Sequence, residues 1–216
     1  MRPIFITGTG TDVGKTVVSA IVTEALQADY WKPIQSGFAS GTDALSVQQL
    51  LPPSDRIVHP ETYKLFLPAS PHIAARQDGV AISLENIVTQ YRSIQQQRPT
   101  GTPIVIEGAG GIMVPLNDTQ FVGDLIEQLQ AQVILVSRNY LGSINHSLLT
   151  ASYSKQKQLN VMGWVFNDHF MNYEQEIVNW TGYPSLASIP YATEVTPQFI
   201  QQQAEAIRPA LLQQLQ

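Results

Sequence analysis

Nearly continuous apolar runs alternate with amphipathic segments along the whole chain. The runs over 103–107, 132–137 and 160–167 have the pattern of strands buried on both faces of a sheet. Between such runs, apolar residues recur at helical spacing, most clearly over 84–97. The alternation predicts an α/β fold, a mostly parallel sheet with helices on both faces, in a single domain over 1–216.

Capping residues and prolines predict where the other elements begin and end. Thr42 or Asp43 can cap a helix over 44–51, and Ser83 can cap 84–97. The tryptophans fall within predicted strands or helices, so we expect Trp31, Trp164 and Trp180 in the core. The remaining expected elements are strands over 4–7, 29–34, 62–67 and 185–189, and helices over 17–26, 70–76, 121–129, 142–157, 172–180 and from 197 onward.

A glycine- and threonine-rich loop joins the first strand to the first helix and ends in Gly-Lys-Thr. Backbone N–H groups of such a loop bind phosphate at a helix N-terminus, Lys15 reaches the outer phosphates, and the Thr16 hydroxyl binds Mg²⁺. The usual G-x-x-x-x-G-K-[ST] spacing requires glycine where this chain has Thr9, between Gly8 and Gly10. The alternative is a tight turn with an exposed lysine, but the strand before the loop favours phosphate binding.

Charged residues follow other predicted strands, and the carboxyl ends of parallel strands meet at the ligand-binding edge of the sheet. Glu107 ends an apolar strand before Gly108–Gly111, as the second-strand acid of phosphate-loop proteins does. Asp43 is either a third metal ligand or only a helix cap, and Lys32 either stabilises transferred charge or extends toward solvent. We therefore predict a Mg²⁺ site that includes Thr16 and Glu107, with Asp43 as a candidate third ligand; the family resemblance given below implies all three.

Composition excludes several classes of protein. The net charge of -5 argues against a nucleic-acid partner, and no apolar run is long enough to span a membrane. The chain has no cysteine, which excludes a disulfide framework, a cysteine zinc site and a thiol nucleophile. The 4 histidines stand alone in their segments, so packing or capping roles are favoured over metal binding. We expect a cytoplasmic protein.

Recognition of a nucleotide base is less clearly marked. A guanine site of the Asn-Lys-x-Asp type is missing, because residues 167–170 read Asn-Asp-His-Phe. Asn167 follows a predicted strand, so its amide can pair with adenine, although Asn-Asp is also a common turn sequence.

Several motifs, in one order along most of the chain, resemble those of the dethiobiotin synthetase family. The resemblance implies an ATP-dependent ligase of biotin synthesis. It would convert 7,8-diaminononanoate and CO₂ (or bicarbonate) to dethiobiotin through a carbamate and a carbamic-phosphoric anhydride, releasing ADP and phosphate. The motifs are TGTGTDVGKT (7–16), KPIQSG (32–37), TDA (42–44), SPH (70–72), EGAGG (107–111), LGSINH (141–146), GWVFND (163–168) and IPY (189–191).

The resemblance also implies roles for individual residues. The catalytic residues would be Lys15 and Lys32, which hold the γ-phosphate and carbamate, with Thr11 and Ser36, which hydrogen-bond the carbamate or diamine. ATP would contact Asp12, Val13, Gly14, Lys15, Thr16, Val17, Asp43, Glu107, Gly108, Ala109 and Gly110 through its phosphates and metal, and Asn167, Asp168, Pro190, Tyr191 and Ala192 through adenine. The substrate's carboxylate would bind the partner subunit at Gly142, Ser143, Ile144 and Asn145, which implies a homodimer with composite active sites.

Two other classes share this ATP-binding pattern. A switch ATPase of the chromosome-partitioning or septum-placing kind carries a signature lysine early in the loop, where this chain has Gly10. Such switches also use a basic surface or an amphipathic membrane tail, which the sequence lacks. An amide-forming synthetase of corrin biosynthesis normally needs a glutaminase part with a catalytic cysteine, and this sequence contains no cysteine.

Overall fold

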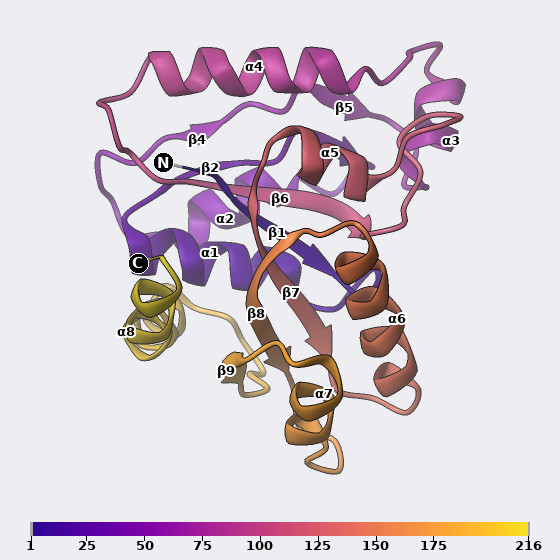
Figure 1. Ribbon diagram of the computed structural model, residues 1–216. Coiled ribbons are helices and arrows are strands. Elements are labelled where there is room, and N and C mark those ends of the chain that lie inside the picture. The colour runs from indigo at the N-terminus through magenta and orange to yellow at the C-terminus, as the bar shows by residue number, and fades with distance from the viewer. Residues whose placement is uncertain (1, 216) are drawn as a thin grey trace.

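The computed structural model describes residues 2–215, and a parallel sheet runs through its centre (Figure 1). Every pairing in this sheet is parallel, which confirms the predicted α/β class. Within the described residues, its seven strands lie in the order β4 (Val58–His59), β2 (Asp29–Trp31), β6 (Ile104–Gly111), β1 (Ile4–Gly8), β7 (Gln132–Arg138), β8 (Asn160–Asn167) and β9 (Ser185–Ile189).

Helices cover both faces of the sheet, so each strand is apolar on both sides and reads as a continuous run. Neighbouring residues on β2 point to opposite faces: Tyr30 packs in one core cluster and Trp31 in the other. The α1 face is covered by α1 (Lys15–Leu26), α2 (Asp43–Leu50) and α8 (Pro197–Gln214), and the α4 face by α3 (Pro71–Gln77), α4 (Leu84–Gln96), α5 (Val122–Gln128), α6 (Ser143–Gln156) and α7 (Glu174–Thr181).

A second, two-stranded sheet lies beyond the carboxyl end of β2. After Pro33 the chain forms β3 (Ile34–Ser36), which pairs in parallel with β5 (Tyr63–Leu65). The apolar pattern predicted strands over 29–34 and 62–67. It did not predict β3 as a strand of its own, because the residues after Ile34 are polar, and it gave no sign that β3 pairs with β5. The pairing places Ser36 beside the edge of the main sheet where the phosphate loop also lies.

Most other elements begin and end close to their expected bounds, but two further expectations were wrong. β6 does not end at Glu107: it continues through Gly111, which pairs with Gly8 of β1. A Cβ at Gly108 would lie 2.7 Å from the Phe5 ring, so this glycine allows close strand packing. Trp180 is 54% exposed on the outer side of α7, whereas Trp31 and Trp164 are fully buried.

Across residues 2–215, no helix has the combination of length and apolar character that crossing a lipid bilayer requires. That the chain is one domain stays a prediction, although both core clusters pack on the same sheet.

Candidate active site

The phosphate loop leaves the carboxyl end of β1 and enters α1 at Lys15. Gly14 is the N-cap residue of this 12-residue helix, and within the described residues no side chain caps it. The first N–H groups of α1 therefore point into the loop without an intrahelical partner. Together with the positive end of the helix dipole, they form a suitable binding site for phosphate oxygens.

Main-chain contacts fix the shape of the loop. The N–H of Thr9 donates to the carbonyl of Val136 at 2.9 Å, and Asn167 Nδ2 donates to the carbonyl of Val13 at 2.6 Å. Gly14 has φ +90°, and a Cβ there would lie 2.4 Å from Asn167 Nδ2. Glycine is therefore required both by the left-handed backbone and by the side chain packed against it.

Lys15 lies folded within the loop. Its Nζ donates to the carbonyl of Gly10 at 2.7 Å, and only 7% of the residue is exposed. Burial lowers the pKa of Lys15 to about 8, because the nearby Glu107 only partly offsets the burial and Lys32 adds repulsion. A phosphate group near this amine would favour its charged form.

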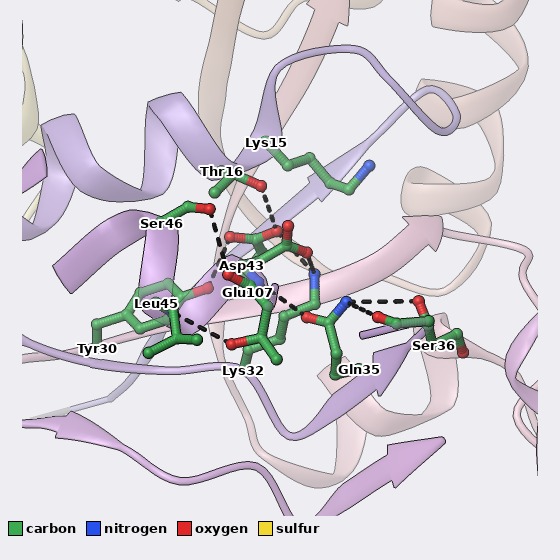
Figure 2. A network of polar contacts seen from close by, with 12 residues as sticks. Lys15, Thr16, Tyr30, Lys32, Gln35, Ser36, Asp43, Leu45, Ser46 and Glu107 are labelled. Atoms are coloured by element: carbon green, nitrogen blue, oxygen red, sulfur yellow. Dashed lines mark hydrogen bonds and ion pairs between the residues drawn. The ribbon is translucent and has the colours of Figure 1, made fainter. Parts of the chain in front are cut away.

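A buried carboxylate with three donors lies next to the loop (Figure 2). Oε1 of Glu107 accepts hydrogen bonds from the Thr16 hydroxyl at 3.0 Å and from Lys32 Nζ at 2.8 Å. Oε2 accepts one from the Tyr30 hydroxyl at 2.8 Å. Lys32 also forms an ion pair with Asp43, so its ammonium bridges two carboxylates.

Burial and neighbouring charges together shift the pKa values of Lys32 and Tyr30. Burial by itself would lower the pKa of Lys32, but the attraction of Glu107 and Asp43 outweighs it and raises that pKa, so Lys32 carries its charge. Burial and the neighbouring Glu107 raise the pKa of Tyr30 well above its usual value. Its hydroxyl is therefore a proton donor to Glu107 at neutral pH.

Gln35 connects Asp43 to the loop that follows β3. The N–H of Asp43 donates to Gln35 Oε1 at 3.0 Å, and Gln35 Nε2 donates to the Gly37 carbonyl at 2.9 Å. Thr42, one of the two expected caps, is the N-cap of α2, and its side-chain oxygen accepts a hydrogen bond from the N–H of Leu45. The buried hydroxyl oxygen of Ser36 has no hydrogen-bond partner among the described residues.

Two clefts meet at the phosphate loop. The larger has a volume of about 700 Å³ and is lined by Thr11, Asp12, Gly14, Lys15, Thr16, Val17, Lys32, Ile34, Gln35, Ser36, Asp43, Pro68, Ala69, Ser70, Pro71, Glu107, Ala109, Gly110 and Val114. The smaller, of about 210 Å³, is lined by Asp12, Val13, Gly14, Val17, Arg138, Asn167, Asp168, Ile189, Pro190, Tyr191, Ala192, Val195 and Phe199.

Comparison with known proteins identifies the family. A protein-family model described as an AAA domain matches residues 2–198. ATP-dependent dethiobiotin synthetase BioD of Cytophaga hutchinsonii is 48% identical to the chain over 93% of its length and 94% of the relative. The enzyme of the same name from Afipia carboxidovorans is 40% identical over 97% of the chain and 93% of the relative. The chain belongs to the dethiobiotin synthetase family.

Solved structures share the fold of this dethiobiotin synthetase family member at low sequence identity. The MinC:MinD cell division protein complex of Aquifex aeolicus aligns with a TM-score of 0.58 and 14% identity, covering 100% of this chain and 96% of that one. A ParA family ATPase from Chlorobium tepidum aligns with a TM-score of 0.57 and 12% identity, covering 100% and 95%. At such identities, the likeness shows the fold alone.

The structure brings together most of the residues that the dethiobiotin synthetase motifs single out. The catalytic and metal candidates line the larger cleft, and the adenine candidates line the smaller one. Gly108 lines neither cleft, and nor do the residues of 142–145 at the start of α6. The sequence did not point to Tyr30, because only the pairing of β2 with β6 brings its hydroxyl to Glu107. Gln35 lies within the motif KPIQSG (32–37), but the motif alone gave no role for its side chain.

The oxygen atoms near Lys32 suit a hard cation. Thr16 supplies a hydroxyl, and Asp43 and Glu107 supply carboxylates, which are the ligand types that Mg²⁺ prefers. Among residues 2–215, no group of three or more His, Cys, Asp or Glu side chains could hold a metal by itself. The hydroxyl of Thr16 and the carboxylates of Asp43 and Glu107 nevertheless fit Mg²⁺, because this ion usually binds through one or two carboxylates together with substrate phosphates.

Proposed function

We propose that this protein closes the ureido ring of dethiobiotin from 7,8-diaminononanoate and CO₂, with ATP as the phosphoryl donor. One observation carries the proposal beyond family membership. The ammonium of Lys32 is buried between Glu107 and Asp43, at the end of the cleft that begins at the phosphate loop. A cation there is suited to the negative charge of a transferred phosphoryl group.

The reaction divides into three steps. An amine of the substrate attacks CO₂ and loses a proton, which gives a carbamate. A carbamate oxygen attacks the γ-phosphorus of ATP, and ADP leaves. The second amine then attacks the carbonyl carbon of the mixed anhydride, phosphate leaves with the C–O bond electrons, and loss of a proton completes the ring.

The side chains serve these steps by positioning and by charge, since phosphoryl transfer needs no protein nucleophile. Lys15 and Lys32 line the same cleft; Lys15 would hold the β- and γ-phosphates, and Lys32 would contact the carbamate and the γ-phosphate. Thr11 and Ser36 line the same cleft and would hydrogen-bond the carbamate or diamine. The partnerless Ser36 hydroxyl supports this role, because a buried polar atom normally has a partner.

Thr16, Asp43 and Glu107 would hold Mg²⁺, which when bound neutralises charge on the nucleotide phosphates. The adenine base would occupy the smaller cleft, which shares Asp12, Gly14 and Val17 with the larger one. Because Asn167 Nδ2 is committed to Val13, its Oδ1 is left to accept a hydrogen bond from the adenine amine. ATP dependence also fits the expected cytoplasmic location, which stays a prediction.

A homodimer would complete the substrate site. α6 has 14 residues, its N-cap is Gly142, and among the described residues no side chain caps it; Leu141, just before the cap, is 86% exposed. Because 142–145 line neither cleft of their own chain, this helix start would serve the cleft of a second copy. Its positive end would bind the substrate's carboxylate.

ADP release tests the proposal directly. Purified protein is incubated with ATP, Mg²⁺ and bicarbonate, with and without 7,8-diaminononanoate, and both ADP and dethiobiotin are quantified. We expect ADP only when the diamine is present, in equal amount to dethiobiotin. Slow ADP release that is indifferent to the diamine would refute the proposal and favour a switch ATPase.

A further inference from the structure

Tyr30 contacts the candidate metal ligand Glu107 from outside the active-site cleft. Tyr30 pairs with Val105 in the sheet, so Glu107 lies one pleat further along β6 on the same face. Long side chains reach such diagonal neighbours, and the Tyr30 hydroxyl donates to Glu107 Oε2 at 2.8 Å. Tyr30 is fully buried and Glu107 is 1% exposed, so water cannot substitute for this contact.

The two oxygens of Glu107 therefore differ in their surroundings. Oε1 contacts Thr16 and Lys32, which both line the 700 Å³ cleft, whereas Oε2 contacts Tyr30, which does not. In Figure 2, Tyr30 lies to the left of the carboxylate and the Lys32 amine to its right. The hydroxyl of Tyr30 thus holds one oxygen on the core side and leaves the other facing the cleft.

We infer that Tyr30 is a positioning residue that reserves Oε2 of Glu107, so that this carboxylate offers the cation only Oε1 and the site favours Mg²⁺ over Ca²⁺. The inference rests on the proposed function for the presence of a cation. Mg²⁺ keeps six ligands in a tight octahedron, whereas Ca²⁺ accepts more ligands and often takes both oxygens of a carboxylate. A carboxylate whose Oε2 is held on the core side cannot turn both oxygens toward one cation in the cleft, so it is a poorer ligand for Ca²⁺.

The test compares two metal–nucleotide complexes. Calorimetric titration gives the dissociation constants of the full chain for ATPγS with Mg²⁺ and with Ca²⁺, and the readout is their ratio, Ca²⁺ over Mg²⁺. In Tyr30→Phe we expect this ratio to fall about tenfold, the scale of one charge-assisted hydrogen bond. Tyr91→Phe removes the hydroxyl of a buried tyrosine on α4, outside both clefts, and should leave the ratio unchanged.

A purely structural role for Tyr30 would weaken both complexes in the same proportion, and that result overturns the inference. Tyr30→Met removes the same hydroxyl with a side chain that fills irregular space, and it replaces Tyr30→Phe if that variant melts early. An unchanged ratio in a variant that still makes dethiobiotin refutes the role of Tyr30 and leaves the proposed function standing. Wild-type protein that binds neither complex refutes both.

Discussion

Replacement of Lys32 tests whether the buried ion group stabilises the protein before any ligand binds. Lys32→Met keeps most of the side-chain volume and leaves Glu107 without its cation. Removing one partner of a buried ion pair costs roughly 3–5 kcal/mol. The lower end applies here, because Glu107 keeps the hydroxyls of Tyr30 and Thr16 and the Asp43 side chain is 35% exposed.

We therefore expect the free energy of unfolding to fall by about 3 kcal/mol, which for a chain of this length lowers Tm by roughly 6–12 °C. Urea and thermal unfolding at pH 7, followed by circular dichroism, measure both quantities. Lys157 provides the matched control, since it too bridges two carboxylates, Asp124 at 2.7 Å and Glu127 at 3.1 Å, but on the surface.

Lys157→Met should change stability little, because exposed ion pairs are screened by water and salt. If Lys32→Met unfolds at the wild-type midpoint, or loses no more stability than Lys157→Met, the ion group does not stabilise the ligand-free fold.

Three further substitutions test the site in steady-state kinetics. Lys15→Gln should lower kcat for ADP release by at least about a hundredfold, because a charge beside the transferred phosphoryl is lost; near-normal kcat would contradict its role. Glu107→Ala should raise the KM for MgATP by about tenfold or more, and an unchanged KM would remove it from the metal site. Gly142→Asp should raise the KM for the diamine about tenfold by charge repulsion. Gly142→Asn imposes the same backbone strain at φ +102° without the charge and should not raise it.

The phosphate loop could be predicted from the sequence because its chemistry lies in one contiguous segment. A strand, glycines and Gly-Lys-Thr occur together, and local backbone geometry follows from those residues. The edge of the sheet was predictable for a related reason, since the ends of parallel strands meet wherever the order of strands is regular. Glu107, Lys32 and Asp43 could each be assigned to that edge separately.

Features that depend on pairing between distant segments could not be predicted. The contact of Tyr30 with Glu107 depends on the register of β2 against β6, and the extension of β6 depends on the pairing of Gly111 with Gly8. Trp180 shows a different limit, because the spacing of apolar residues on α7 does not fix which side of a short helix faces the core. The pairing of β3 with β5 across a proline-rich stretch is another contact between distant segments that the sequence did not indicate.

The four charged residues of the site form a set whose formal charges cancel. Lys15 and Lys32 balance Asp43 and Glu107, and all but Asp43 are almost fully buried. A site built to receive phosphate would otherwise hold unpaired buried cations, which folding does not tolerate. The residues that we assign to catalysis are therefore also residues that the ligand-free fold needs. A variant at Lys32 or Glu107 should lose stability and activity together, so unfolding must be measured before a loss of turnover is attributed to chemistry.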